Sequence, residues 1–417
     1  MIKRIPVEQL RLGMYVHSLN RDWIKHPFLF NRFWLDDDSQ ISRILALGVD
    51  QVDIDTSRGR DVLAVPSARE LAQETQTARK LKPEQGFEAA ARQRPPAFQK
   101  ATLREERRRA RRILHEASRV ADRLMDDARL GQHLELGPAR EVIGQTVASI
   151  MRNQDALIGL NRIRTVDQYT FEHSINVAVL MIAFARALGF ERSLIEEIGL
   201  GALLHDVGKS RIPEVILNKP GKLTPEEFEV IQGHVAHGHE ILVKTSDISL
   251  TALDVVLEHH ERIDGTGYPE GKPGASISRF GQMAAIVDVY DALTTRRVYH
   301  DAMPPHEALR NLLQWSPQQF DRTLVQQFIR CVGIYPIGTL VRLESERLAV
   351  VVETGREQLL RPVVRLVFDI QERRRLMPQD IDLSLMTAYG QDRIIKAENP
   401  ADWGLRPEYL LAQKAGV

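Results

Sequence analysis

The feature that most constrains this chain is a concentration of histidine in one part of its sequence. Seven of the thirteen histidines lie between His173 and His260. One of them, His205, is followed by Asp206 in the run LLHDVGK, and Asp288 follows the group in IVDVYDAL. Imidazole and carboxylate are ligands that divalent transition metals accept. Because uncompensated charge is costly to bury, these residues indicate a metal site inside a folded domain.

The surrounding sequence predicts helices from Leu136 to about Gly333. Apolar residues recur at helical spacing in segments such as SINVAVLMIAFARALG and PEEFEVIQGHVAHGHEIL. Pro225 suits a first helical turn, and Thr224 before it is a suitable N-cap. After Tyr335 the segments GTLVRLESERLAVVVE and RPVVRLVFDI alternate apolar and polar residues, which predicts strands.

The N-terminal part divides into two segments by composition. Residues 1–65 alternate in short runs broken by glycine, which predicts a small domain of strands with some helix. A group of aromatic residues in it indicates a compact core, with a ligand or partner surface as the alternative: Trp23, Phe28, Phe30, Phe33 and Trp34. Residues 66–101 are poor in large apolar side chains and contain Pro83, Pro95 and Pro96, which predicts a linker.

Residues 102–130 predict a charged helix that resembles a coiled coil. Its apolar residues recur every seven positions, at Leu103, Ala110, Ala117 and Leu124. This stripe predicts a homodimer, but docking of the helix on the rest of the same chain would give the same pattern. The basic run REERRRARR is interrupted by two glutamates and lacks aromatic residues, so it favours a solvated face over nucleic-acid binding.

Bulk composition excludes several classes of protein. Lysine plus arginine equals aspartate plus glutamate, at 56 each, so no global basic field favours nucleic acid. The single cysteine, Cys331, excludes an intrachain disulfide and a thiolate metal cluster. The longest strongly apolar stretch, Val177–Ala185, is far shorter than the roughly 20 residues of a membrane span. We therefore expect a cytoplasmic protein that does not enter a membrane.

Three motifs agree in order and spacing with a known family. HDVGK, HHER-IDGTGYP and DVYDALTTRR-VY closely resemble the HD-GYP domain over roughly residues 140–335. This domain is a branch of the HD phosphohydrolases associated with hydrolysis of the bacterial messenger cyclic di-GMP. The resemblance implies an all-α, metal-dependent HD-type core at residues 136–335. The multidomain fold is completed by a small α/β or β-rich N-terminal domain and a short β-rich C-terminal appendage at residues 336–417.

The resemblance also implies a binuclear site with two divalent metal ions. Iron or manganese is the first expectation, and other transition metals are alternatives. Asp206 would bridge the two ions. The remaining ligands would be His173, His205 and Asp288 on one ion and His234, His259 and His260 on the other. Two such ions activate water and stabilise the attacking and leaving oxygens of a phosphodiester.

Further roles follow from the same motifs. Asp206 and Lys209 would be catalytic, and the substrate phosphate would contact Lys209, Arg297 and His300. Arg296 is an alternative to Arg297 for the contact with the substrate phosphate. The signature loop Gly267, Tyr268 and Pro269 is intact, and in relatives it has a structural role or contacts partners that include GGDEF-domain proteins.

One position departs from the family pattern. Some relatives bind a third metal through a glutamate one helical turn before the first histidine ligand, and this chain has Tyr169 there. Because tyrosine replaces a carboxylate ligand poorly, we predict two metals. This leaves open whether the linear product pGpG is cleaved further to GMP.

These features lead to one leading function and two alternatives. The resemblance implies a phosphodiesterase that hydrolyses cyclic di-GMP to pGpG. A protein of another class, an adaptor with a weakly active or inactive site that signals through protein contacts, is the main alternative. A phosphohydrolase acting on a different nucleotide is disfavoured by the intact loop and by Arg297.

Overall fold

The computed structural model describes residues 2–7, 10, 13–18, 33–35, 41, 44, 51–56, 101–163, 169–295, 302–316, 318–355, 358–385 and 392–412. The chain divides into two units, residues 1–93 and 94–417. The first contains β1 (Ile2–Pro6), β2 (Tyr15–Ser18), β3 (Phe33–Trp34) and β4 (Gln51–Asp55).

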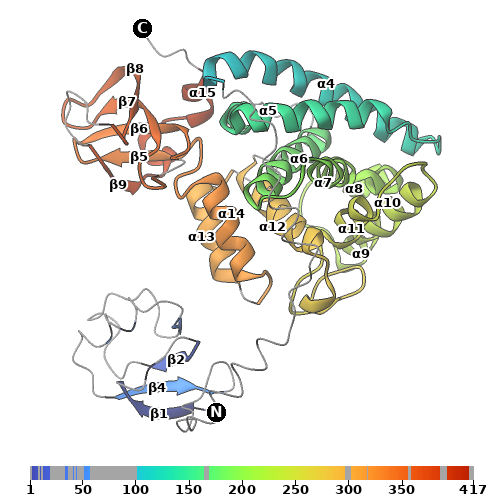
Figure 1. Ribbon diagram of the computed structural model, residues 1–417, viewed down its shortest axis with the longest axis horizontal. Coiled ribbons are helices and arrows are strands. Elements are labelled where there is room, and N and C mark those ends of the chain that lie inside the picture. The colour runs from blue at the N-terminus through green and yellow to red at the C-terminus, as the bar shows by residue number, and fades with distance from the viewer. Residues whose placement is uncertain are drawn as a thin grey trace. The chain divides into compact units, whose positions relative to one another are not determined.

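The second unit begins with helices and ends with a sheet (Figure 1). Its helical elements are α4 (Leu103–Arg129), α5 (Gly137–Asn161), α6 (Tyr169–Ala187), α7 (Arg192–Leu204), η3 (Val207–Arg211), α8 (Glu214–Leu217), α9 (Pro225–Gln232), α10 (His234–Val243), α11 (Leu250–Glu258), η4 (Gly274–Ser276), α12 (Arg279–Thr294), α13 (Pro305–Trp315) and α14 (Arg322–Val332). They are followed by β5 (Leu340–Leu343), β6 (Arg347–Glu353), β7 (Val363–Asp369), β8 (Arg374–Asp382), β9 (Ile394–Ala397), η5 (Pro400–Trp403) and α15 (Pro407–Ala412).

The N-terminal unit is a small antiparallel sheet in the order β1-β4-β2-β3. Ile5, Val16, Val52 and Ile54 are buried in its core, as the alternating sequence predicts. Of the aromatic group expected there, Trp23, Phe28 and Phe30 lie outside the described residues. Phe33 and Trp34 form β3, and their side chains lie outside the described part as well.

Helix α6 is the centre of the second unit. It packs against α4, α5, α7, α12 and α14, and every residue from Val177 to Ala185 is buried. The apolar stretch noted in the sequence is therefore part of a helix that is buried among other helices. Within the described residues, no helix combines the length and the hydrophobicity needed to cross a bilayer.

Helix α4 packs its apolar stripe on its own chain. Thr102 caps the helix in a capping box with Glu105, and Ala110, Ala117 and Leu124 are buried against the neighbouring helices. The contacts are with α5, α6 and η3. Of the two explanations that the sequence left open, docking within the chain is observed, and a homodimer stays a prediction.

The charged run on α4 is not solvated throughout. Glu106 is fully buried, where its carboxylate accepts hydrogen bonds from Arg152 at 2.8 Å and from Ser149 at 2.8 Å. Burial acts to raise the pKa of Glu106, but these donors and the Arg152 charge outweigh it and lower the pKa. Glu106 is thus an internal ion-pair partner that holds α4 on α5.

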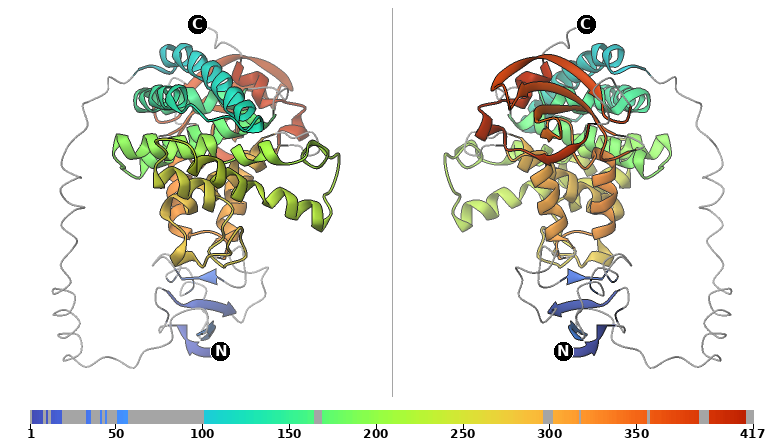
Figure 2. Two further views of the ribbon diagram at one scale, coloured as in Figure 1. Left: turned by 90° about the vertical axis from the view of Figure 1, so that its right-hand side faces the viewer. Right: turned by 90° about the vertical axis from the view of Figure 1, so that its left-hand side faces the viewer.

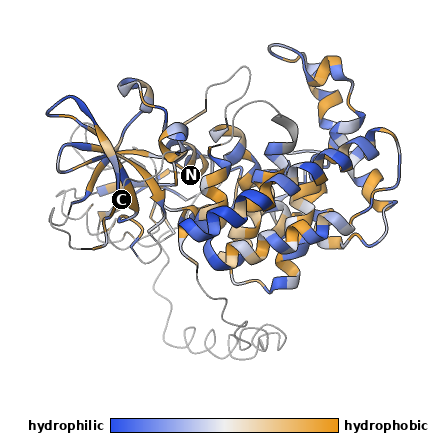
Figure 3. Ribbon diagram, turned by 90° about the horizontal axis from the view of Figure 1, so that it is seen from above, coloured by the Kyte–Doolittle hydropathy of each residue, from blue (hydrophilic) through white to orange (hydrophobic). Residues whose placement is uncertain are grey.

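The C-terminal sheet is antiparallel, in the order β8-β7-β6-β5-β9, and it uses both of its faces. On β6, Leu348, Val350 and Val352 belong to the core shared with the helices, whereas Ala349 and Val351 belong to a separate cluster on the opposite face. Successive side chains along a strand point to opposite faces of the sheet, so one strand contributes to both clusters. Figure 3 shows the sheet beside the helices, with hydrophobic and hydrophilic stretches interleaved.

Replacement of Glu106 by alanine should destabilise the second unit by about 2 kcal/mol or more, because Arg152 would then keep a part-buried, unpaired charge. Glu116 is the matched control, since its pair with Arg119 on the same helix is exposed. Glu116→Ala should change the stability by less than about 0.5 kcal/mol. Urea unfolding of both variants measures the difference, and equal effects would contradict the role assigned to Glu106.

Candidate metal centre

Five helical segments converge on one buried cluster of imidazoles and carboxylates. His173 lies on α6, His205 and Asp206 follow α7, and His234 begins α10. His259 and His260 follow α11, and Asp288 lies on α12. Two groups of ligand atoms, each within 4.8 Å of one another, could each hold a metal ion: His173, His205 and Asp206, and His234, His259 and His260.

Asp206 lies between the two groups. Its Oδ2 atom is 3.4 Å from Nε2 of His205, and its Oδ1 atom is 3.4 Å from Nε2 of His234. Asp288 also contacts both groups: its Oδ1 is 3.0 Å from Nε2 of His173, and its Oδ2 is 3.6 Å from Nδ1 of His260. The two carboxylates therefore connect the imidazoles of one group with those of the other.

Three of the imidazoles are oriented by backbone carbonyl groups of the helices that end just before them. Nδ1 of His205, His234 and His259 lies 2.7–2.8 Å from the carbonyl oxygen of the residue three positions earlier. Nδ1 must donate in such a bond, so the proton is on Nδ1 and the lone pair is on Nε2. All three Nε2 atoms are thereby available for a cation, which is how metal-ligating histidines are commonly held.

The fourth imidazole is oriented by a carboxylate that the sequence analysis missed. Nδ1 of His173 lies 2.8 Å from Oδ2 of Asp291, which is buried one turn after Asp288 on α12. The spacing of three residues in DVYD was the available signal, because it places both carboxylates on one helical face. Burial acts to lower the pKa of His173, but hydrogen bonds with Asp288 and Asp291 raise it to about 9.

The donor set fits divalent metal ions. Among the described residues, Nε2 of His205 and Oδ1 of Asp206 are buried atoms without a hydrogen-bond partner, and both belong to the cluster. Burial lowers the pKa of His234 to about 4 and that of His260 to about 3, so both rings are neutral at pH 7. Neutral imidazoles and ionised carboxylates are the form in which these groups bind metal, so His173, whose pKa is raised, would release its proton when a metal ion binds.

The carboxylates of the site are ionised despite their burial. Burial by itself would raise the pKa of Asp206, but His205 and Lys209 hold it well below the usual range. Asp288 is also held below its usual pKa, in spite of burial, chiefly by its hydrogen bond with His173. Lys209 reaches Asp206 directly, with Nζ 2.7 Å from Oδ2. The other two residues expected to contact substrate, Arg297 and His300, lie outside the described residues.

The signature loop is fixed by a buried glutamate. The Glu261 carboxylate accepts the backbone N–H groups of Glu270 and Lys272, each at 2.9 Å. Gly267 has no room for a side chain, since a Cβ there would lie 2.3 Å from the backbone nitrogen of Arg262. The ring of Tyr268 then lies 4.6 Å from that of His260. Close packing therefore requires glycine at position 267. The role of Glu261 was not predicted from the sequence.

Gly208 of the HDVGK motif has a similar role. Gly208 has no positive φ and lies within η3, so its backbone conformation does not require glycine. A Cβ at this position would lie 1.9 Å from the carbonyl oxygen of His234 and 2.4 Å from the backbone nitrogen of Gly238. The absence of a side chain at Gly208 allows the turn that carries Asp206 to approach α10. This approach brings Asp206 within reach of His234.

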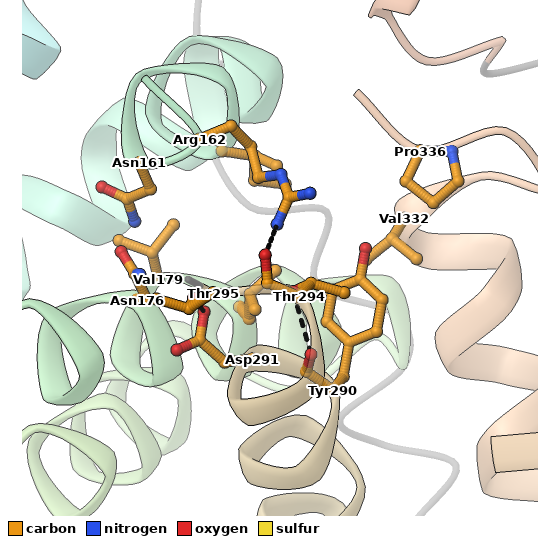
Figure 4. A pocket seen from close by; sticks show the side chains of 12 residues that line it. Asn161, Arg162, Asn176, Val179, Tyr290, Asp291, Thr294, Thr295, Val332 and Pro336 are labelled. Atoms are coloured by element: carbon orange, nitrogen blue, oxygen red, sulfur yellow. Dashed lines mark hydrogen bonds between the residues drawn. The ribbon is translucent and has the colours of Figure 1, made fainter. Parts of the chain in front are cut away.

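A small cavity of about 30 Å³, lined by both polar and apolar side chains, lies beside Asp291 (Figure 4). In it, the Thr295 hydroxyl lies 3.2 Å from Oδ1 of Asp291, and Arg162 donates to the carbonyl oxygen of Thr294 at 3.0 Å. Asn176 also lines the cavity. These contacts hold the end of α12, and with it Asp291, against the ring of His173.

Asp291→Asn should lower the metal affinity about 10- to 100-fold, because the charged partner that orients His173 is lost. Metal analysis after dialysis against a graded series of chelator concentrations measures this. Asp254→Asn, on α11, is the control and should retain the metal content of the unmodified protein. Retention of full affinity by Asp291→Asn would contradict the orienting role.

Gly208→Ala should destabilise the protein by about 1–3 kcal/mol or more, because the new methyl group meets backbone atoms that cannot move aside. Gly144→Ala, inside α5, is the matched control. A Cβ there would lie 3.9 Å from its nearest neighbour, Oε1 of Glu196, so the higher helix propensity of alanine should raise stability slightly. Thermal unfolding of the two variants should therefore shift in opposite directions.

Comparison with known proteins agrees with this architecture. Residues 2–139 match the family described as Domain of unknown function (DUF3391), and residues 145–324 match the HD domain. A cyclic di-GMP phosphodiesterase of Pseudomonas aeruginosa is 39% identical over 413 residues, 97% of this chain and 94% of that protein. A cyclic di-GMP phosphodiesterase of Thermotoga maritima is 38% identical over 165 residues, 39% of this chain and 45% of that protein.

Among solved structures, an HDG"Y"P protein from Bdellovibrio bacteriovorus matches with a TM-score of 0.46 and 19% identity, over 79% of this chain and 98% of that one. The family assignment rests on the full-length relative from Pseudomonas aeruginosa and on the two family models. HD domains are metal-dependent, in keeping with the two ligand groups found here. The chain therefore belongs to the HD-domain family, in the HD-GYP branch that its motifs predict, and carries the DUF3391 domain at its N-terminal end.

Proposed function

We propose that this protein is a metal-dependent phosphodiesterase that hydrolyses cyclic di-GMP to linear pGpG and so lowers the level of this messenger. The observation that carries the proposal is the convergence of all seven predicted ligands on one buried cluster, with Lys209 beside it. The full-length relative from Pseudomonas aeruginosa, which is named for this activity, supports the choice of substrate.

The proposed site holds two divalent metal ions. His173, His205 and Asp288 would bind one, His234, His259 and His260 the other, and Asp206 both; iron or manganese is the proposed identity. Such ions supply Lewis acidity toward a phosphodiester and lower the pKa of water that they bind.

The chain's own residues contribute charge and orientation. Lys209 is a cation beside Asp206, so its ammonium group can be shared with a non-bridging oxygen of the substrate phosphate. Asp291 and the three helix carbonyls keep the imidazoles oriented before substrate arrives, which is the preorganisation that electrostatic catalysis requires. Arg297 and His300 are proposed as further phosphate contacts.

The remaining parts of the proposal follow from the sequence. Tyr169 begins α6, and its side chain lies outside the described part, so a two-metal site with pGpG as the end product stays a prediction. Contacts with GGDEF-domain proteins through Gly267–Pro269 and a homodimer are also predictions. A cytoplasmic location suits the buried, free thiol of Cys331.

The test is hydrolysis of cyclic di-GMP by purified full-length protein, loaded anaerobically with iron or manganese, with separation of products and a count of bound metal. We expect pGpG to accumulate with about two metals per chain. Asp206→Ala should lose both turnover and metal, because it removes the carboxylate between the two groups. Glu240→Ala, which removes an exposed partner of Arg211, is the control and should be fully active.

Absence of turnover in protein that binds its metals would reject the phosphodiesterase proposal and favour the adaptor alternative. Accumulation of GMP instead of pGpG would reject only the two-metal prediction based on Tyr169. The same assay with 3'3'-cGAMP, in which adenine replaces one guanine, determines how strictly the site selects its base.

A further inference from the structure

A helical arm extends from the body of the protein beside the metal centre. It runs from Pro213 to Gly233, contains α8 and α9, and is yellow-green in Figure 2, where it projects from the helical body. All of these residues are described, and none of their side chains is buried. The arm therefore has no hydrophobic core of its own and is not explained by packing.

Polar contacts keep the arm ordered. Lys219 and Glu227 form an ion pair across it at 2.6 Å, and Thr224 caps α9 in a capping box with the same glutamate. At its base, the carbonyl oxygen of Ile231 receives the 2.7 Å hydrogen bond from Nδ1 of His234. The end of α9 thus orients a predicted metal ligand, which fixes the arm relative to the metal centre.

The arm carries an exposed aromatic ring close to that centre. Phe228 on α9 is 47% exposed, and its ring lies 6.4 Å from that of Tyr268, edge to face. Tyr268 in turn lies 4.6 Å from the ring of His260. A continuous row of rings therefore connects a predicted metal ligand to an aromatic face in solvent.

An exposed phenylalanine without core neighbours is unfavourable in water, and it indicates a ligand surface when it lies next to a reactive centre. Nucleobases stack on such rings, and each stacked base contributes enough to change affinity tenfold or more. In a cyclic dinucleotide the base is joined to the phosphodiester through one ribose, so a phosphate at the metals places a base within reach of this row.

We propose that Phe228 is a substrate-binding residue that stacks on a base of the substrate while the phosphodiester lies at the metal centre. The proposal rests on the proposed function, since it assumes a purine cyclic dinucleotide as the substrate. Phe228 is a positioning residue in this view, because it contacts the base and not the reacting bond.

The test compares Phe228→Ala with Val230→Ala in metal-loaded, full-length protein. Val230 is the matched control because it lies on the same helix, is 40% exposed and is two residues, about 200° of helical turn, away from Phe228. Phe228→Ala should raise KM for cyclic di-GMP about tenfold or more, with a smaller change in kcat. Phe228→Trp should restore KM, and Val230→Ala should leave it unchanged.

Two binding measurements separate stacking from damage to the site. Calorimetry with a phosphorothioate analogue of cyclic di-GMP, which resists hydrolysis, should show the same loss of affinity in Phe228→Ala. Inorganic phosphate, which has no base, should bind to this variant and to the unmodified protein equally. Weaker binding of phosphate, or a lower metal content, would mean that the substitution acts through His234 and would overturn the proposal.

The outcomes also distinguish this inference from the proposed function. If the unmodified protein does not hydrolyse cyclic di-GMP but binds the analogue more tightly than Phe228→Ala does, the proposed function fails and the stacking role stands. If the unmodified protein turns over cyclic di-GMP and Phe228→Ala has the same KM, the stacking role is wrong and the proposed function stands. Equal binding of the analogue by both proteins would likewise reject the stacking role.

Discussion

The burial of one carboxylate determines how the helical core is arranged. Asp206 is 2% exposed, and an ionised group at such a position is unstable unless cationic or hydrogen-bonding partners surround it. Lys209 supplies a cation from η3, and the imidazoles of His205 and His234 face the carboxylate, where a bound metal ion would complete its partners. The turn after α7 must therefore lie against α10, and Gly208 is the residue that permits this approach. Helix packing and site chemistry are consequences of the same contact.

Much of the fold and the positions of the site residues could be predicted because their signals are local. Thr224 and Pro225 indicate the start of α9, and the observed capping box agrees with this prediction. The ligand set came from motifs whose order and spacing resemble a family. What could not be predicted depends on partners far apart in the chain. From the sequence alone, Glu106 would be taken for a surface glutamate. Its partner Arg152 lies on another helix, and only folding brings the two residues together.

The same explanation applies to the carboxylates around the metal centre. Asp291 follows Asp288 by three residues, but its partner His173 is 118 positions away, so only the folded chain reveals the pair. Glu261 is adjacent to two predicted ligands, and its role became visible only when its contacts with the backbone of the signature loop were known. Phe228 belongs to no motif. It was identified because its side chain is exposed beside the metal centre, and sequence patterns do not reveal that position.

The anchoring of three imidazoles to carbonyl oxygens of the helices that end just before them has a consequence for how the site changes over time. Each Nδ1 hydrogen bond uses a backbone carbonyl as its acceptor, and no substitution removes that carbonyl. Substitutions of neighbouring side chains therefore leave the orientation of these imidazoles unchanged. Unwinding of the helix ends would change it. Fraying of the last turn of α9 would rotate His234 and disable one half of the site while leaving the other intact. Heat or denaturant would therefore disturb the ligand group around His234 before the helical core itself unfolds.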